Sequence, residues 1–392
     1  MNVYENQVLY SSILSFDPVI RRHEIHPAGM PQDPRKGNPN MSPVIEAYPG
    51  YEVFEDGSME IRYFAPNARD VRIKNFSVSS TEDIVFEKRD DGYFVAKLTD
   101  VPVGYYWFRL LVDGNETISP DLPISYTNGY CNFVDMVDAS SEYYLLKDVP
   151  HGAITQEYYK SEIAGRTRTC WVYTPPSYGE DPERRYPVLY IHHGGGSEAT
   201  CWFWQARMNL ILDNMISERQ CKEMIVVANW GYAYKEIGHN QFTPVNAAEV
   251  ISKECVSFID KKYRTIADRR SRAAAGLSYG GGLSRQMVHD YPEIFANLGQ
   301  FSSGAGFEIK AETQGRSYDY SDLFRTPEHF NELFDVTFVM VGRQDMRIEY
   351  TKPQVLELIE KGYNIVYKDY PGGHEFKVWR AALLDFLPLL WK

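Results

Sequence analysis

Residues 276–280, "GLSYG", place Ser278 between two glycines, and this serine is the strongest candidate nucleophile in the chain. The apolar run "SRAAAG" precedes it, and the helical pattern "GGLSRQMVHDYP" follows. In a G-x-S-x-G turn between a strand and a helix, the residues two before and two after the serine must lack bulk, and the hydroxyl projects above the helix N-terminus. A flexible Gly/Ser turn is the alternative. The strand–turn–helix context favours the nucleophile.

A serine hydroxyl becomes a good nucleophile only when a histidine takes its proton and a carboxylate orients that histidine. In the chain order that fits a strand–turn–helix serine, the acid and then the base lie downstream of it. The run "DVTFVMVG" predicts a strand, and Asp345 lies just past its end. His374 lies in "KDYPGGHEFKVW", between the last short strand and the closing helix. These positions predict a triad of Ser278, Asp345 and His374.

Other downstream residues compete for the roles of base and acid. His289 falls within the helix after the serine and His329 in a polar helical segment, where solvated surface positions are expected. Asp335 precedes its strand, and Asp369 lies on the next strand, so neither follows a strand end. Asp345 is therefore the preferred acid.

Acyl transfer passes through a tetrahedral oxyanion, which needs two backbone N–H donors. Tyr279 supplies one by its position after the nucleophile, and the glycine run after "VLYIHH" supplies the other from Gly194 or Gly195. A phosphate-binding loop does not explain that run, because no GK[ST] follows it. Trp202 lies a few residues further on, and two interpretations stay open: a wall of the acyl pocket, or core packing.

Changes of sequence pattern divide the chain into segments. Residues 1–45 are polar and Pro-rich and predict an extended arm or linker. Residues 46–135 carry short alternating strands separated by turn residues and predict a small β-sandwich, and 136–150 form a linker. In 151–392, apolar strands alternate with amphipathic helices, which predicts a doubly wound α/β sheet covered on both faces. Ligands of such sheets bind at the carboxyl ends of the strands.

Composition limits the partners and cofactors. A formal net charge of -12 and a pI near 5.3 leave no basic face, so no nucleic-acid partner is expected. The 5 cysteines are scattered without metal-ligand spacing, so neither a disulfide framework nor a metal site is expected, and no cofactor is implied. No apolar run predicts membrane insertion, and the N-terminus lacks a signal-peptide pattern. A cytoplasmic protein is expected, or a secreted or periplasmic one if a leader has been removed.

Residues of about 150–390 resemble the putative-esterase family, which includes carbohydrate esterase family 1, enterochelin esterase and S-formylglutathione hydrolase. The segments that carry the resemblance to feruloyl and acetylxylan esterases are, in order, "VLYIHHGGGSEATCW", "ILDNMI", "EMIVVANWGYA", "AAAGLSYGGGLS", "VGRQD" and "GGHEFKVWR". The resemblance implies an α/β-hydrolase fold and a serine esterase with Ser278 as nucleophile, Asp345 as acid and His374 as base. Relatives often carry glutamine at the position of His192 and methionine at that of Tyr279, so substrate preference is expected to differ.

The segments "IRYFAPNARDVRI" and "DGYFVAKLTDVPVGYYWFRLLVDGNETISPD" are similar to the carbohydrate-binding module family 48 domain, an immunoglobulin-like early set. This module is paired with esterases among feruloyl esterases of polysaccharide-degrading bacteria. Tyr105, Tyr106 and Trp107 then form either a sugar platform or part of the packing, because alternation along "YYWFRL" buries every second residue. The module otherwise serves to shape or cover the esterase cleft.

Three functions compete. The leading expectation is a serine esterase that releases ferulate or acetate from feruloylated or acetylated xylo-oligosaccharides of plant arabinoxylan through an acyl-enzyme. A siderophore trilactone esterase is the alternative enzyme, although an acidic chain offers few cations for an anionic catecholate ligand. A non-catalytic glycan-binding protein is the third, and the complete Ser–Asp–His set argues against it.

Overall fold

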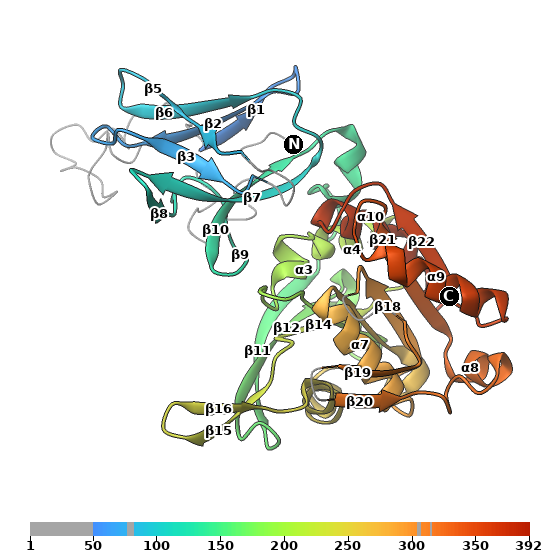
Figure 1. The fold of residues 1–392 in the computed structure, drawn as a ribbon. Helices are drawn as coiled ribbons and strands as arrows, with labels where there is room; N and C mark the ends of the chain where they lie inside the picture. Colours follow the sequence, from blue (N-terminus) through green and yellow to red (C-terminus); the bar gives the residue numbers. More distant parts are fainter. Residues whose placement is uncertain (1–49, 77–81, 304–306, 314–315) are drawn as a thin grey trace. The chain divides into compact units, whose positions relative to one another are not determined.

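The structure, a computed structural model, describes residues 50–76, 82–303, 307–313 and 316–392. The chain divides into two units, Met1–Leu146 and Lys147–Lys392, each with its own strands and buried core (Figure 1). The arm predicted for residues 1–45 lies outside the described residues.

The N-terminal unit is a sandwich of two sheets, with strand orders β1-β2-β6-β5 and β4-β3-β7-β10-β9, and β8 paired to β7. One face of each sheet is apolar, and residues such as Ile61, Phe94 and Phe108 share a buried core. Alternation of side chains along each strand produces these two apolar faces. The strands are Tyr51–Val53 (β1), Met59–Phe64 (β2), Val71–Lys74 (β3), Ile84–Val85 (β4), Glu87–Lys88 (β5), Tyr93–Leu98 (β6), Gly104–Val112 (β7), Asn115–Thr117 (β8), Ile124–Tyr126 (β9) and Tyr130–Met136 (β10).

The aromatic residues at the start of β7 take part in packing. Tyr105 is buried, and its hydroxyl hydrogen-bonds to Ser125 Oγ at 2.6 Å. Tyr106 stacks on Phe76 with ring centroids 4.9 Å apart. Trp107 is only half-buried. Tyr106 thus packs against the core between the two sheets, whereas Tyr105, on the opposite face of β7, packs against Phe133 with ring centroids 4.7 Å apart.

The C-terminal unit is built on an eight-stranded sheet of order β11-β12-β14-β13-β17-β18-β21-β22. The strands from β14 to β22 pair in parallel, which confirms the predicted doubly wound α/β sheet, and the sequence reasoning missed the antiparallel pair β11 and β12 at one edge. The strands are Ala153–Ser161 (β11), Arg166–Thr174 (β12), Val188–His192 (β13), Ile225–Asn229 (β14), Arg272–Leu277 (β17), Asn297–Phe301 (β18), Val336–Gly342 (β21) and Val366–Tyr370 (β22).

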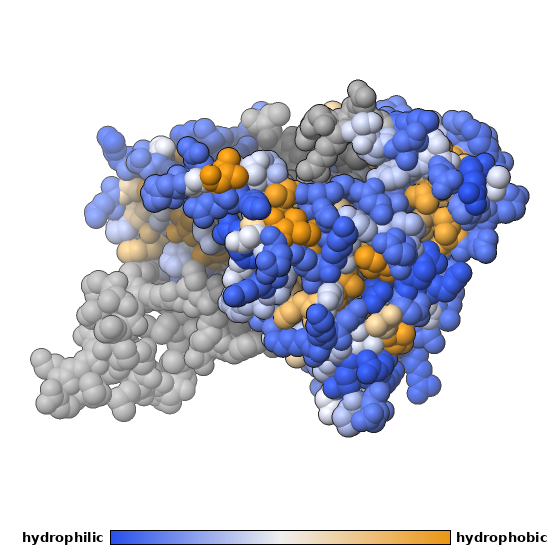
Figure 2. Space-filling model, turned by 90° about the horizontal axis from the view of Figure 1, so that it is seen from below, coloured by the Kyte–Doolittle hydropathy of each residue, from blue (hydrophilic) through white to orange (hydrophobic). Residues whose placement is uncertain are grey.

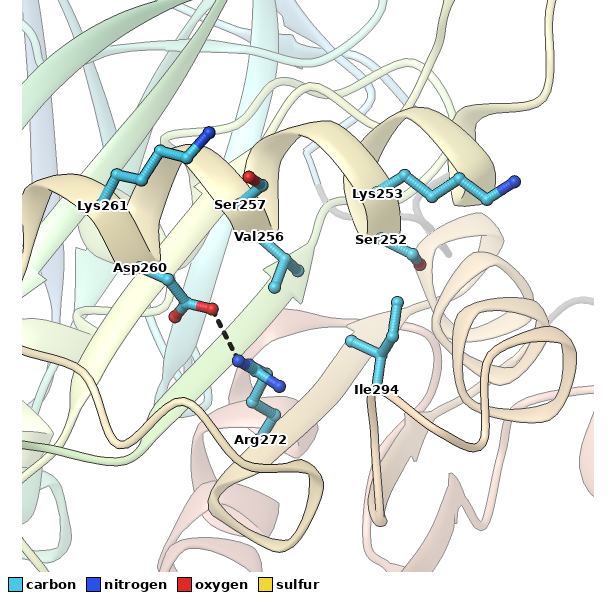
Figure 3. Close-up of a pocket in the computed structure, with 8 residues that line it drawn as sticks. All are labelled: Ser252, Lys253, Val256, Ser257, Asp260, Lys261, Arg272 and Ile294. Carbon is cyan, nitrogen blue, oxygen red and sulfur yellow. Dashed lines mark hydrogen bonds and ion pairs between the residues drawn. The ribbon is translucent and has the colours of Figure 1, made fainter.

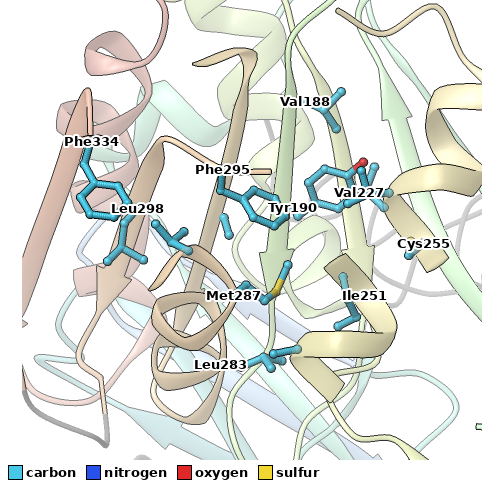
Figure 4. Packing of buried hydrophobic residues seen from close by; sticks show 14 of the residues in the cluster. Val188, Tyr190, Val227, Ile251, Cys255, Leu283, Met287, Phe295, Leu298 and Phe334 are labelled. Atoms are coloured by element: carbon cyan, nitrogen blue, oxygen red, sulfur yellow. The ribbon is translucent and has the colours of Figure 1, made fainter. Parts of the chain in front are cut away.

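Helices cover both faces of this sheet. On one face Ile251, Leu283 and Met287 point from helices toward sheet residues such as Tyr190 and Val227 (Figure 4). The α-helices are Cys201–Trp204 (α3), Met208–Ser217 (α4), Ala247–Glu249 (α5), Val256–Lys262 (α6), Tyr279–Asp290 (α7), Pro327–Leu333 (α8), Ile348–Glu360 (α9) and Phe376–Phe386 (α10), and a π-helical segment spans Val250–Cys255. Two hairpins pair Tyr234–Gly238 (β15) with Gln241–Pro244 (β16) and Lys310–Thr313 (β19) with Arg316–Asp319 (β20). The 3-10 turns are Ala139–Tyr144, Pro176–Gly179, Arg269–Ser271 and Leu387–Leu389.

The second face of the sheet is covered by α10. The Phe386 ring lies 5.5 Å from the rings of both Phe301 and Phe338, measured between centroids. Gly299 lies beneath Phe386, because a Cβ added at this glycine would come within 2.7 Å of the ring. The neighbouring strands β18 and β21 are thus buried on both faces, as their continuous apolar sequences predict.

The surface is mostly hydrophilic on the face drawn in Figure 2, where the hydrophobic residues form separate groups. Within the described ranges, no helix combines the length and apolar character that crossing a bilayer requires.

A groove of about 450 Å³ lies beside the helix that contains Asp260 (Figure 3). The Asp260 carboxylate accepts a hydrogen bond from the Arg272 guanidinium at 2.6 Å. Arg272 is the first residue of β17, whereas Ser278 follows the last residue of the same strand. The groove therefore lies at the amino end of the strand, away from the carboxyl ends where sheets of this kind bind ligands.

Candidate active site

Ser278 joins β17 to α7 in a strained turn. Its φ of 52° and ψ of -116° are values that residues with a Cβ rarely adopt. The backbone is held there because Ser278 N–H donates to Phe301 O at 2.8 Å and Ser278 O accepts from Gly281 N–H at 3.1 Å. The side chain is thereby held at the carboxyl end of the sheet.

The two glycines that flank Ser278 are explained by backbone crowding. A Cβ added at Gly276 would lie 2.4 Å from Gly280 O and 2.9 Å from His192 O. A Cβ added at Gly280 would lie 2.4 Å from His192 O and 2.5 Å from His193 O. The start of α7 therefore packs directly against the ends of β17 and β13, and side chains at these positions would force them apart.

Asp345 and His374 form a close hydrogen-bonded pair. His374 Nδ1 lies 2.7 Å from Asp345 Oδ2 and donates to it, because the carboxylate is an acceptor. The other oxygen, Oδ1, accepts from the Arg347 N–H at 3.1 Å and from its guanidinium at 2.9 Å. Burial tends to raise the pKa of Asp345, but the hydrogen bonds from His374 and Arg347 outweigh it and hold the pKa at about 2. The carboxylate is ionised and both of its oxygens are held.

The loop that carries His374 folds over the end of β21. Gln344 N–H donates to Gly372 O at 3.0 Å. The His374 ring meets the Trp379 ring edge to face, with centroids 5.0 Å apart, and Trp379 Nε1 donates to Ser302 Oγ at 3.2 Å. Ser302 follows β18, which lies between β17 and β21 in the sheet. Through Trp379, His374 is therefore held beside the end of β18.

The sheet order therefore brings the three predicted residues to neighbouring strand ends. Leu277 is paired with Phe301, and Phe301 with Met340, so β17, β18 and β21 lie side by side. Between the described side chains of Ser278 and His374 no hydrogen bond is formed. Such contacts often tighten only when a substrate binds.

The glycine run after β13 lies against Ser278. A Cβ added at Gly194 would lie 3.4 Å from Ser278 Cβ and 2.5 Å from a methyl carbon of Leu277, so a larger residue here would require the Leu277 side chain to shift. The N–H groups of Gly194 and Gly195 make no hydrogen bond to the described part of the chain. Tyr279 is the first residue of α7, where the partial positive charge of the helix gathers. These amides suit the binding of negative charge beside Ser278.

Tyr279, which follows Ser278, belongs to an aromatic group whose other members the sequence analysis did not identify. The Tyr232 ring stacks on Tyr279 with centroids 4.7 Å apart, and Trp230 meets Tyr232 edge to face at 5.7 Å. Trp230 is 41% exposed and Tyr279 is 39% exposed. The available signal was "WGYAY" directly after the strand β14, since strand ends are where ligands bind in such sheets. We call Trp230, Tyr232 and Tyr279 the aromatic wall.

Trp202 lies in the core. Its side chain has no exposed surface, and its Nε1 donates to His192 O at 2.9 Å. Its ring meets Phe301 edge to face at 5.4 Å. Of the two interpretations of Trp202, this burial favours core packing, because a side chain without exposed surface cannot contact an acyl group.

The expectation that His289 lies on the surface is wrong. This residue is 4% exposed, and its ring is enclosed by aromatic rings that belong to Phe307, Tyr320, Phe324 and Phe334. Burial lowers its pKa well below the ordinary value, so the ring is neutral. The helical position alone did not reveal this environment, because the enclosing residues come from segments that follow later in the chain.

The alternative acids are engaged elsewhere. Asp335 is paired with Arg270, which precedes β17. Asp369 is paired with Arg343 at 2.7 Å and with Lys352 at 3.0 Å. Asp345 is the aspartate that contacts His374.

Comparisons with known proteins bear on this arrangement. A family model described as "Putative esterase" matches residues 161–390. An endo-1,4-beta-xylanase/feruloyl esterase of Xylanibacter ruminicola is 29% identical over 378 residues, which are 92% of this chain and 49% of that protein. The chain thus spans about half the length of this relative.

Two solved structures share the fold. A ferulic acid esterase of Anaeromyces mucronatus, solved in complex with ferulic acid, superposes with a TM-score of 0.54 at 21% identity, covering 63% of this chain and 94% of that one. The enterobactin esterase of Shigella flexneri superposes with a TM-score of 0.58 at 14% identity, covering 88% of this chain and 97% of that one. The C-terminal unit therefore has the α/β-hydrolase fold.

Replacing Asp345 with asparagine tests the environment of this carboxylate. Because its folded pKa of about 2 lies below the ordinary value of 3.8, the ionised form stabilises the fold at neutral pH, and that stabilisation is lost as the pH falls through about 4 toward 2. The shift corresponds to about 2 kcal/mol. We expect Asp345→Asn to unfold at lower urea concentration than the parent at neutral pH, with the difference shrinking across this window.

The matched control is Asp322→Asn, because the Asp322 side chain is 84% exposed and its ion pair with Arg325 is 3.3 Å long. This variant should show the parent's urea midpoint throughout. A difference between Asp345→Asn and the parent that stays constant from neutral pH to about pH 2 would contradict the assignment.

Proposed function

The chain belongs to the Putative esterase family and is a carboxylic ester hydrolase, and we propose that Ser278, His374 and Asp345 carry out its reaction. The observation that carries this proposal is the 2.7 Å hydrogen bond between Asp345 and His374, at the strand ends next to the strained turn of Ser278. A neutral imidazole oriented by an ionised carboxylate is the base that a serine nucleophile requires.

The proposed reaction has two halves. In the first, Ser278 Oγ attacks the ester carbonyl carbon while His374 Nε2 takes the hydroxyl proton, and the tetrahedral intermediate then collapses. His374 returns the proton to the departing alcohol, which leaves an acyl group on Ser278. In the second half, His374 takes a proton from water as the water oxygen attacks the acyl carbon. The tetrahedral intermediate then collapses, His374 returns the proton to Ser278 Oγ, and the carboxylic acid is released.

Asp345 stabilises the imidazolium that forms in each half of the reaction. Its Oδ2 accepts the Nδ1 proton of His374, while Arg347 holds Oδ1. Since both oxygens are held, the carboxylate keeps the imidazole in the tautomer whose Nε2 carries no proton and can accept one from the nucleophile.

Negative charge on the carbonyl oxygen is proposed to be stabilised by two backbone N–H groups. One belongs to Tyr279 at the start of α7, and the other to Gly194 or Gly195. Donors that are oriented before the reaction act without reorganisation, and removing one such donor typically costs a factor of about 10² to 10³ in kcat.

We propose that the acyl group is aromatic, with ferulate esterified to arabinoxylan oligosaccharides as the substrate class. The aromatic wall supports this, because Tyr279 is partly exposed next to Ser278, and Trp230 is partly exposed on the far side of Tyr232, which stacks on Tyr279. The relation to a Xylanibacter protein named as a xylanase and feruloyl esterase supports it too. An acetyl group would leave this ring surface uncovered, so acetate is the weaker candidate.

The N-terminal sandwich remains a predicted relative of carbohydrate-binding module family 48. We assign glycan recognition to the C-terminal unit, because Tyr105 and Tyr106 are used in packing the sandwich.

Replacing Ser278 with alanine tests the nucleophile and the substrate class together. The parent and Ser278→Ala are compared on methyl ferulate, acetylated xylan and a catecholate trilactone. We expect the parent to favour methyl ferulate and the variant to lose on the order of 10⁵-fold in kcat. Hydrolysis that survives in the variant contradicts the mechanism. Turnover confined to the trilactone would show that the substrate is a siderophore and not a xylan ester. Xylan binding without hydrolysis of any ester would indicate a glycan-binding protein.

Replacing Trp230 with alanine tests the aromatic wall. Loss of a ring contact worth about 1.4 kcal/mol would lower kcat/KM for methyl ferulate about 10-fold while leaving 4-nitrophenyl acetate within about twofold. Tyr158→Ala is the control, because Tyr158 is a 61% exposed aromatic residue on the edge strand β11. Equal losses on both esters, or equal losses in both variants, would show that Trp230 does not select the acyl group.

A further inference from the structure

Gly231, in the loop after β14, is hydrogen-bonded to His193, which precedes the proposed glycine donors, and to the side chain of Tyr279, whose N–H is the other proposed donor. Its N–H donates to His193 Nε2 at 2.9 Å, and its carbonyl accepts from the Tyr279 hydroxyl at 3.1 Å. His193 directly precedes Gly194, and Tyr279 directly follows Ser278. One residue of a third segment therefore connects the two segments that supply the donors.

The hydrogen bonds of His193 define its tautomer. Because Nε2 accepts from Gly231, Nδ1 carries the proton and donates to Gly194 O at 2.7 Å. Burial lowers the pKa of His193 to about 4, so the ring stays neutral and keeps this tautomer at neutral pH.

The bond from His193 also sets the direction of an amide. In a trans peptide the C=O and N–H point in opposite directions across one plane, and the chain contains no cis peptide among its described residues. Holding Gly194 O therefore sets the direction of the Gly195 N–H, which points away from the buried imidazole. His193 thus helps to set the orientation of the glycine run, together with the Ser197 N–H, which donates to Gly194 O at 3.3 Å, and Gly231 helps to set that of His193.

The same loop supports the other donor segment. The Tyr232 ring stacks on Tyr279 at 4.7 Å, and Tyr232 Oη accepts from Gly196 N–H at 3.4 Å. The Tyr279 side chain is thus held by its hydroxyl and by its face, at the first turn of α7. Contacts to the glycine run and to α7 come from neighbouring residues of one short loop.

The loop itself is anchored to the sheet by a buried arginine. Arg168, on β12, is 6% exposed, and its guanidinium donates to Trp230 O at 2.8 Å and to Tyr232 O at 3.0 Å. These carbonyls flank Gly231 on both sides. A planar guanidinium that binds both carbonyls holds the intervening peptide in a fixed position relative to the strand.

We propose that residues 230–232 act as a brace that sets the spacing of the two oxyanion donors, with His193 and Tyr279 as positioning residues on either side of Gly231. The proposal rests on the proposed function, since it assigns a role within the same site. A brace of this kind stabilises the transition state more than the bound ester, because charge develops on the carbonyl oxygen only during reaction.

Replacing Tyr279 with phenylalanine removes the hydroxyl that bonds Gly231 and leaves the ring to stack on Tyr232. The probes are 4-nitrophenyl acetate, whose acyl group is too small to test the aromatic wall, and phenylboronic acid, which forms a tetrahedral adduct with a serine nucleophile. We expect kcat and phenylboronic acid affinity to fall together by about 10-fold, with KM within about twofold of the parent.

Tyr234→Phe is the matched control. It removes a hydroxyl from a tyrosine three residues beyond Gly231, and in the described part of the chain that hydroxyl makes no hydrogen bond. It should keep the parent's kcat, KM and phenylboronic acid affinity.

His193→Gln, alone and combined with Tyr279→Phe, tests whether both residues act through Gly231. Glutamine retains a donor and an acceptor but places them differently, so its kcat should also fall. If the two bonds form one brace, the double variant loses less than the product of the two single losses. If the loss of kcat in the double variant equals the product of the two single losses, the proposal of a shared brace is wrong.

Unchanged kcat and phenylboronic acid affinity in Tyr279→Phe, or a loss confined to KM, would also overturn it. Ser278→Ala in the same assay separates this failure from failure of the proposed function. If Ser278→Ala abolishes turnover while Tyr279→Phe matches the parent, the brace fails and the esterase mechanism stands.

Discussion

Backbone contact at the turn of Ser278 is the constraint on which the rest of the site depends. The ends of β17 and β13 and the start of α7 meet so closely that a single added Cβ at Gly276 or Gly280 would lie within 2.5 Å of a neighbouring carbonyl oxygen. This contact holds Ser278 at a positive φ and brings the glycine run after β13 against it. The strain of one residue is stabilised by two fully buried strands, so the proposed nucleophile is held in place by the fold itself.

The parallel sheet then supplies the other chemical groups. Because β18 and β21 follow β17 in the sheet, the loop beyond β21 places Asp345 near the serine, and the next loop returns His374 over the same strand ends. Residues that are nearly a hundred positions apart in the chain thus converge, because β17, β18 and β21 are neighbouring parallel strands whose carboxyl ends lie at one edge of the sheet. The loop after β14 adds aromatic surface from the other side of β13, so the aromatic wall and the proposed catalytic residues share one edge of the sheet.

Much of this arrangement could be predicted from the sequence, because buried parallel strands are continuous apolar runs and the chemical residues follow their ends. Ser278, Asp345 and His374 were found in this way, and their roles remain predictions. The antiparallel strands β11 and β12 were missed, since they alternate polar and apolar residues, whereas the parallel strands predicted in the same unit are continuous apolar runs. The environments of His289 and Trp202, and the bonds of Gly231, depend on contacts between distant segments that no local pattern encodes.

The proposed mechanism requires a covalent bond between the acyl group and Ser278 Oγ. Rapid acid quenching of the parent with an excess of 4-nitrophenyl ferulate, followed by mass spectrometry of the intact chain and of its peptides, measures that bond directly. The predicted result is an added feruloyl group on the peptide that contains Ser278, formed in the same phase as a burst of 4-nitrophenol. Steady hydrolysis with no adduct on the chain, or an adduct on a different residue, would contradict the proposed mechanism.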